Sequence, residues 1–295
     1  MKLGSRGSAL ALAQAGLVRD RLAALGQEVE LVVIRTAGDE RPAGEPAAET
    51  NDKERFVKEI EDALLDGRID MAVHSAKDVP GELPDGLAIV GVPERADPRD
   101  ALCGAASLDA LGDGAVVGTA SVRRRSQLLA ARPDLDVREV RGNVDTRLRK
   151  LADGEYGALV LAAAGLARLG RDEGAAVDTG VMLPAPGQGC LALEGREGDE
   201  RVSELAVELT DYAALVALTA ERALVARLEA TCDTPVGAHA VLEDDALVLH
   251  GYAGTPDGAT WIRDALEGPA KEPAALGAAV GERMLAAGAR QVLES

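Results

Sequence analysis

The residues best suited to chemistry lie between Met71 and Pro80, in the run Met-Ala-Val-His-Ser-Ala-Lys-Asp-Val-Pro. Apolar residues alternate with small or polar ones up to Val73, as in a β-strand, and Pro80 ends the regular structure. In α/β domains, ligands bind at the carboxyl ends of strands. Lys77 can hold an anion at such an end, and Asp78 can accept a proton or stabilise a cation. Taken alone, the run is explained equally well by a surface turn with an ordinary ion pair.

Arg6 and Ser8 occupy a similar position near the start of the chain. They lie between a strand predicted at residues 2–5 and a helix predicted at 9–25, which Ser8 can cap. A helix N-terminus attracts anions, so this junction is a natural anion site. Plain capping beside a solvated arginine explains it equally well.

Three later junctions repeat this arrangement. Strands predicted at 115–119, 137–140 and 158–162 are each followed by a short polar segment and then by the next predicted helical stretch, with Ser121 and Asn143 as candidate N-caps. The arginines at these junctions are Arg123, Arg124, Arg125, Arg141, Arg147, Arg149 and Arg168. Cations in a first helical turn oppose the helix dipole unless an anion binds there, and we expect only Arg125 of the first three to be solvated. Because arginine suits bidentate capture of carboxylates, the set predicts a small ligand with several carboxylates.

The composition narrows the class of protein. The chain has 295 residues, which suffice for two or three domains, and 47% are hydrophobic but only 2% aromatic, so Ala, Val and Leu must build the core. A net charge of −18 makes nucleic-acid binding a poor candidate. With no apolar run long enough to span a membrane and no signal segment, we expect a cytoplasmic protein. Such acidity is also what a high-salt cytoplasm would favour.

The three cysteines differ in their surroundings. Cys103 and Cys190 lie within apolar runs and are expected to be buried thiols. Cys232 lies in a polar loop, where it can be reached as an attachment point or a nucleophile. The wide spacing, without a CxxC pair or a nearby histidine, predicts neither a disulfide framework nor a metal site.

Strands and helices alternate through the first part of the chain, which predicts parallel α/β sheets. Residues 40–55 read as a mobile loop and a candidate lid, followed by a helix at 57–65. Segments 93–98 and 184–189, rich in Pro and Gly, are expected to be crossings between domains. After a helix predicted at 213–228, the remainder reads as a small α+β tail with antiparallel strands and a closing helix.

These motifs together resemble the porphobilinogen deaminase family, over nearly the whole chain and in the family's order. The matching pieces are Ser5–Ser8 with Ala11–Gln14, Phe56–Glu59, His74–Pro80, Gly118–Arg124, Arg141–Leu148, Ala163–Leu166, Gly187–Gly189, Glu221–Leu224 and the loop around Cys232. The resemblance implies two α/β domains of the periplasmic-binding-protein type II kind and a small C-terminal α+β domain. The expected ranges are 1–93 with 187–208, then 97–183, then 211–295.

The resemblance also implies an activity, that of a transferase in tetrapyrrole biosynthesis. Cys232 would hold a dipyrromethane cofactor through a thioether. Porphobilinogen would lose ammonia to give an azafulvene, which the free α-carbon of the cofactor's terminal pyrrole attacks. After four rounds, water would release linear hydroxymethylbilane. The implied enzyme is a monomer that uses porphobilinogen as its substrate and needs no metal, nucleic acid or membrane.

Residue roles follow from the resemblance position by position. Asp78, Lys77 and Arg6 would be catalytic, with Asp78 acting on pyrrole N–H groups. The cofactor would be held by Cys232, Lys77, Asp78, Ser121, Arg123 and Arg124. The substrate's carboxylates would be held, or the cleft shaped, by Arg6, Ser8, Arg141, Arg147, Arg168, Gln188 and Lys53.

Two departures from the family pattern affect these expectations. Glu54 and Arg55 follow Lys53 where the family usually has glycine and an apolar residue, so we expect a lid that is stiffer or depends on salt. Thr231 and Thr234 flank Cys232 and Asp233 where the family usually shows Gly-Cys-x-Val. A binding module that closes on a carboxylate ligand without chemistry is the alternative function. It explains the arginines, but not the C-terminal cysteine, and it would show compaction without release of ammonia.

Overall fold

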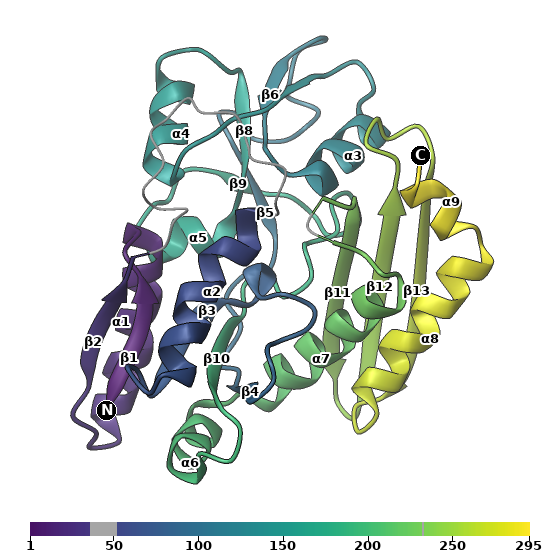
Figure 1. Ribbon diagram of the computed structural model, residues 1–295. Coiled ribbons are helices and arrows are strands. Elements are labelled where there is room, and N and C mark those ends of the chain that lie inside the picture. Colours follow the sequence, from purple (N-terminus) through teal and green to yellow (C-terminus); the bar gives the residue numbers. More distant parts are fainter. Residues whose placement is uncertain (36–51, 232) are drawn as a thin grey trace. The chain divides into compact units, whose positions relative to one another are not determined.

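The computed structural model describes residues 1–35, 52–231 and 233–295, with 52–56 described by their backbone only (Figure 1). They form two compact units. The first consists of Met1–Arg95 and Cys190–Leu215, and the second of Ala96–Gly189 and Val216–Ser295. The second unit thus combines the ranges expected for two domains, and its division into two stays a prediction.

A five-stranded sheet in the order β2-β1-β3-β10-β4 is the centre of the first unit. Its strands are β1 (Lys2–Arg6), β2 (Glu30–Ile34), β3 (Met71–Ser75), β4 (Leu87–Gly91) and β10 (Leu191–Arg196). β1 is parallel to both β2 and β3, whereas β10 runs antiparallel to β3 and β4 between them. The helices of this unit are α1 (Ala9–Ala24), α2 (Asp52–Leu65) and α6 (Glu200–Leu209), and α7 (Tyr212–Arg227) begins in it.

The two faces of this sheet have separate apolar cores, because successive side chains of a strand point to opposite faces. Met71 and Val73 pack with residues of α1 and α6, including Val18 and Val202. Ala72, between them, packs with Ile60 and Leu64 of α2 on the other face (Figure 1).

Helix α2 begins earlier than predicted. It starts at Asp52, so residues 52–55 belong to a helix and not to the predicted loop, whose remainder lies outside the described residues. Lys, Glu and Arg are good helix formers, and that propensity prevails over the turn signal of Asn51 and Asp52.

A second five-stranded sheet, in the order β7-β6-β8-β5-β9, lies in the second unit. Its strands are β5 (Asp100–Cys103), β6 (Val116–Gly118), β7 (Asp136–Arg138), β8 (Ala158–Ala162) and β9 (Ala175–Ala176). The helices that alternate with these strands along the chain are α3 (Val122–Ala131), α4 (Val144–Ala152) and α5 (Ala163–Arg168). β6, β7 and β8 are parallel, and β5 is antiparallel to β8 and β9. The sheet therefore repeats the pattern of the first one, with a single antiparallel strand in the fourth place.

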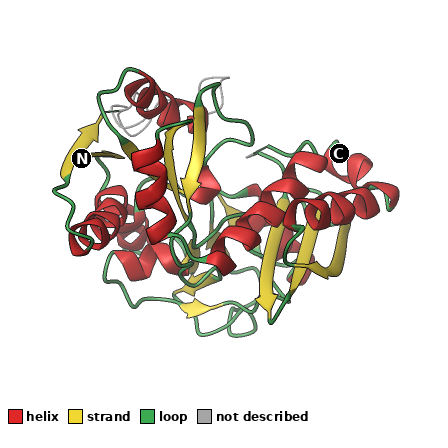
Figure 2. Ribbon diagram, turned by 90° about the horizontal axis from the view of Figure 1, so that it is seen from below, coloured by secondary structure: helices red, strands yellow, loops and turns green. Residues whose placement is uncertain are grey.

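The C-terminal part of the second unit is an antiparallel sheet of β11 (Val236–Glu243), β12 (Ala246–Gly254) and β13 (Trp261–Pro269), with α8 (Pro273–Ala286) and α9 (Ala289–Leu293) (Figure 2). Its core joins α7 and α8 to the sheet, and Gly277 lets α8 approach the Ala220 carbonyl of α7 closely. Tyr252 of β12 also contacts α3, since its hydroxyl lies 2.7 Å from the Ser126 hydroxyl. The expected α/β class, with two sheets of this type and a small C-terminal α+β part, is confirmed.

Candidate active site

One edge of the first sheet brings together residues from two separate motifs. β1 and β3 are parallel neighbours with Leu3 opposite Met71, so Arg6 and the turn at Ala76–Asp78 both follow at the same edge. Arg6, Lys77 and Asp78 are all half-buried there. Ala76 donates its N–H to the Cys190 carbonyl at 3.1 Å, which fixes the start of the turn. The geometry is that expected of an anion site with an acidic group beside it.

Ser8 caps α1, as predicted: its side chain accepts a hydrogen bond from the Ala11 N–H at 3.3 Å. Ser121 and Asn143 cap α3 and α4 in the same way, accepting from the N–H groups of Arg124 and Thr146 at 3.4 and 2.9 Å. These caps set the positions of the helix N-termini at the sheet edges. The contribution of Ser8 and Ser121 to ligand binding stays a prediction.

Two of the predicted arginines meet at a carboxylate that the sequence motifs do not include. Asp100, at the start of β5, is fully buried, and Arg123 and Arg124 are 4% and 6% exposed. Arg123 donates two hydrogen bonds to Asp100, at 2.8 and 3.2 Å. Arg124 donates through Nε to Asp100 Oδ1 at 2.9 Å, and its Nη2 lies 2.7 Å from the same oxygen. The Gln188 side-chain amide donates to Asp100 at 2.9 Å. Asp100 thereby connects three residues predicted to bind cofactor or substrate.

The charges in this network do not balance, since two guanidinium groups share one carboxylate. Burial alone raises the pKa of Asp100, but Arg123 and Arg124 outweigh it and hold that pKa well below its usual range. Arg147 adds a further cation, and its pKa is lowered by burial and then by the like charge of Arg124. A surplus of partly desolvated positive charge of this kind favours an anionic ligand.

The other predicted arginines of the second unit have different surroundings. Arg141 is exposed and forms an ion pair with Glu139 at 2.7 Å. Arg147 donates through Nε to the carbonyl of Gly142, the residue that follows Arg141, at 2.7 Å. Arg168, at the end of α5, donates to the Gly189 carbonyl at 2.6 Å. Arg125 is exposed, as expected.

Cys232 and the side chain of Lys53 lie outside the described residues. On either side of Cys232, Thr231 and Thr234 hydrogen-bond to each other. The Thr234 hydroxyl accepts from the Thr231 N–H at 2.7 Å and lies 3.0 Å from the Thr231 hydroxyl. The two residues that depart from the family pattern therefore hold the ends of this loop together. Cys103 and Cys190 are buried, as predicted.

Glu221 is a second buried carboxylate to which the sequence reasoning gave no role. It is fully buried on α7 and accepts hydrogen bonds from the Gly187 N–H at 2.6 Å and the Ala240 N–H at 2.8 Å. It thus joins the segment 184–189 to α7 and to β11. A glutamate in a helix built mainly of Ala, Leu and Val was the signal that could have revealed it.

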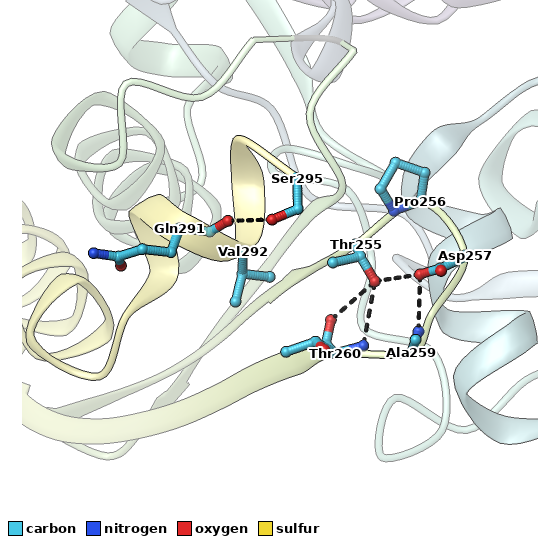
Figure 3. A pocket seen from close by; sticks show the side chains of 8 residues that line it. All are labelled: Thr255, Pro256, Asp257, Ala259, Thr260, Gln291, Val292 and Ser295. Atoms are coloured by element: carbon cyan, nitrogen blue, oxygen red, sulfur yellow. Dashed lines mark hydrogen bonds between the residues drawn. The ribbon is translucent and has the colours of Figure 1, made fainter.

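A hollow of about 480 Å³ lies elsewhere, between the β12–β13 turn and the C-terminus (Figure 3). Its lining residues are Thr255, Pro256, Asp257, Ala259, Thr260, Gln291, Val292 and Ser295, which include no cation. The carboxylate of Asp257 is used within the turn, accepting from the Thr255 hydroxyl and from the Ala259 N–H at 3.0 Å. This hollow is a poor site for a carboxylate ligand.

Two classes of feature are missing from the part of the chain that the structure describes. No group of three or more His, Cys, Asp or Glu side chains is arranged to hold a metal ion. No helix among the described ranges combines the length and apolar character needed to cross a membrane.

Comparison with known proteins gives the same family for both parts of the chain. Residues 1–204 match the family described as porphobilinogen deaminase, dipyromethane cofactor binding domain, and residues 215–286 match its C-terminal domain. Proteins named porphobilinogen deaminase from Thermus thermophilus and Roseiflexus castenholzii are 49% and 47% identical in sequence to this chain. The matches cover 99% of this chain and 97% and 98% of those proteins.

Among solved structures, a periplasmic substrate-binding protein of an ABC transporter from Coxiella burnetii is similar with a TM-score of 0.44 and 15% identity, over 73% of this chain and 94% of that one. The matches in sequence, in contrast, extend over almost the whole length of both partners. The chain belongs to the porphobilinogen deaminase family and is therefore a transferase.

Proposed function

We propose that this chain is a hydroxymethylbilane synthase. It deaminates porphobilinogen, joins four molecules head to tail onto a dipyrromethane primer and releases the linear product by hydrolysis. The observation that carries the proposal is the family match over residues 1–204, which names the dipyrromethane-binding domain. The site's residues are consistent with it, because both substrate and primer carry acetate and propionate groups.

The donor set of the second unit fits such a primer. Arg123 and Arg124 carry one more positive charge than Asp100 neutralises, and Arg147 adds another nearby. Carboxylates bound there relieve the repulsion between Arg124 and Arg147 and form charge-assisted hydrogen bonds. We assign the primer's carboxylates to Arg123, Arg124 and Ser121, and the family resemblance adds Lys77 as a cofactor-binding residue.

When bound, the dipyrromethane supplies the nucleophilic pyrrole carbon onto which the product grows. The protein's own groups bind, orient and move protons. Asp78 accepts hydrogen bonds from pyrrole N–H groups and stabilises the positive charge that develops as ammonia leaves. Arg6 and Lys77 neutralise substrate carboxylates at the same sheet edge. The residues assigned to the growing anionic product are Arg141, Arg147, Arg168, Ser8, Gln188 and Lys53.

We assign the covalent attachment to a thioether at Cys232. The test is the intact mass of the purified protein beside Cys232→Ser, with Cys103→Ser as the matched control, because Cys103 is a buried thiol. We expect an excess mass of two linked pyrrole units in the wild type and in Cys103→Ser, and the bare sequence mass in Cys232→Ser.

A wild type at its bare mass should gain that excess on incubation with porphobilinogen. If no mass is gained at low salt or in molar KCl, the proposed chemistry is wrong. Retention of the excess in Cys232→Ser would instead refute the attachment site alone.

Three further properties belong to this proposal: the enzyme acts as a monomer, in the cytoplasm, and its stability increases with salt. The net charge of −18 supports the last, because salt screens self-repulsion. A folding midpoint that does not rise in molar KCl would contradict it, and light scattering of the purified protein tests the monomer.

A further inference from the structure

Three ionisable side chains lie beneath α2, on the face of the first sheet that this helix covers. Alternation along β3 places His74 on the same face as Ala72, which packs with α2. On β10, Leu191 and Leu193 pack on the opposite face, so Glu194 is directed toward α2. Glu61 belongs to α2 itself, the helix drawn in front of β3 and β10 in Figure 1.

All three side chains are buried, with exposures of 6% for His74, 0% for Glu194 and 7% for Glu61. His74 Nε2 lies 2.8 Å from Glu194 Oε2, but the two are poorly aligned for a hydrogen bond. Within the described ranges, neither oxygen of Glu194 nor Oε1 of Glu61 has a hydrogen-bond partner. Buried carboxylates in such surroundings are costly when ionised, so the cluster must limit its negative charge.

Glu61 is the member that keeps its proton. Its pKa is raised to about 7, mainly by burial and then by the negative charge of Glu194, with a smaller increase from Asp62, while His74 and Lys58 lower it. Among the side chains that the structure describes, the charged or titratable residues on the elements packed around it are Lys58, Glu59 and Asp62 on α2, His74 on β3, Glu194 and Arg196 on β10, and Lys2 and Arg6 on β1, whereas β4 carries none. Below neutral pH, a protonated Glu61 leaves one carboxylate facing one imidazole.

The cluster is joined directly to the turn that carries Lys77 and Asp78. His74 is followed by Ser75 and then by the turn at Ala76–Asp78. β10 carries Glu194 and continues from Cys190, whose carbonyl accepts the Ala76 N–H at 3.1 Å. A displacement of His74 or Glu194 therefore moves the start of the turn.

We propose that Glu61, His74 and Glu194 are positioning residues: with one proton on Glu61, the His74–Glu194 pair holds the Lys77–Asp78 turn in its working position. Ionisation of Glu61 adds a second buried carboxylate, which draws His74 from Glu194 or admits water, and the turn shifts. This inference rests on the proposed function only in taking the turn as catalytic. The roles proposed above for Lys77 and Asp78 do not themselves require an ionisable side chain beneath α2.

The test compares kcat against pH for the wild type, Glu61→Gln and a control, Asp62→Asn. Gln keeps the shape of protonated Glu61 but cannot ionise, and Asp62 is the exposed neighbour on the same helix. We expect kcat of the wild type and of Asp62→Asn to fall about tenfold between about pH 6 and pH 8, as one group with a pKa near 7 ionises. Glu61→Gln should lack this fall, and a profile that superimposes on that of the wild type would overturn the proposal.

A second measurement is independent of turnover and of the cofactor. Infrared difference spectra of wild type labelled with ¹³C-glutamate should show a protonated carboxyl band at about pH 6 that is lost by about pH 8. Absence of that band at the lower pH would refute a proton on Glu61 even if Glu61→Gln fails to fold. If the band titrates but kcat of Glu61→Gln follows the wild type, the positioning role is wrong. A protein that shows the band but no ammonia release and no added mass would refute the proposed function instead.

Discussion

Asp100 accepts a hydrogen bond of 2.8 Å from Arg123 inside the second unit, where the two side chains are 0% and 4% exposed. A buried pair of this kind has little net stability of its own, because removing two charges from water offsets their attraction. Its effect is on position: the pair ties the first turn of α3 to the start of β5. The carboxylate that stabilises the arginines thus also decides where they can meet a ligand.

Removal of that carboxylate should be costly. We expect Asp100→Asn to lower the free energy of unfolding by about 3–5 kcal/mol, because Arg123 and Arg124 keep their charges without an ionised partner. Urea denaturation measures this. Asp97→Asn is the matched control, since Asp97 pairs with Arg99 at 2.7 Å near the surface, and its effect should stay below about 1 kcal/mol. Equal small effects of the two substitutions would contradict the role assigned to Asp100.

Arg147 should contribute to substrate binding more than its neighbours on α4. Arg147→Gln removes a partly desolvated cation, and the loss of a charge-assisted hydrogen bond should raise KM about tenfold to a hundredfold. Arg149→Gln changes an exposed arginine of the same helix and should leave KM nearly unchanged. Steady-state rates of porphobilinogen consumption distinguish the two, and similar KM values would argue against a carboxylate at Arg147.

Asp78→Asn should abolish most turnover while the fold persists. Without the negative charge, the site cannot stabilise the cation that forms as ammonia leaves, and we expect a loss of at least about a hundredfold in kcat. Ammonia release measures turnover, and circular dichroism checks the fold. Asp85→Asn, an exposed aspartate farther along the same segment, should be silent. Near-normal turnover of Asp78→Asn would remove Asp78 from the mechanism.

The two buried thiols should resist alkylation in the native protein. Burial, followed by the charge of Glu173, raises the pKa of Cys103 to about 11, so almost no thiolate exists at neutral pH. Cys190 is fully buried. We expect maleimide to add one label to the unloaded protein and none to the loaded protein, as read by mass. Rapid labelling of loaded, folded protein would show that one of these thiols is accessible.

Stability should depend on pH through Glu61. The folded state holds a proton up to about pH 7 that the unfolded state releases near its ordinary pKa of 4.5. This contribution to the free energy of unfolding is therefore complete below about pH 4.5 and is lost as the pH rises through about 7. The total loss is about 3 kcal/mol. Urea denaturation should show that the stability advantage of Glu61→Gln over the wild type increases by an amount of that order between about pH 5 and pH 8. Asp62→Asn removes only a minor contribution to that pKa and should follow the wild type closely, and parallel curves for all three proteins would contradict the linkage.

Local signals in the sequence predicted much of this fold. Ser121, as a candidate N-cap, predicted the start of α3, and the apolar run at 158–162 predicted the bounds of β8, because caps and apolar strands leave short-range patterns. The strand β5 was missed, since Asp100 follows Pro98 and reads as part of a turn. Its carboxylate is buried at the start of that strand together with two arginines that neutralise it, and this long-range pairing leaves no local pattern.

Contacts between distant strands were beyond prediction from one sequence. His74 lies within the run from Met71 to Pro80 that the sequence singles out, but nothing local indicates that it faces Glu194. That contact depends on the register of β10 against β3, in which Ala192 pairs with His74 and Glu194 with Ala72. Register is set when the sheet assembles around its core, and short-range patterns do not encode the partner.

The place of β10 between β3 and β4 has a consequence for synthesis on the ribosome. β10 comes from Leu191–Arg196, so β3 and β4 have no strand between them until some two hundred residues have been made. Until then β3 has an unpaired edge, and Ala76 lacks the Cys190 carbonyl. The nascent chain can form the β1–β3 part early, but closure of the sheet is a late, non-local event of the kind that slows folding. A chain that stops before Leu191 would leave this edge open to other strands, and a chaperone that shields it would act before the turn at Ala76–Asp78 is complete.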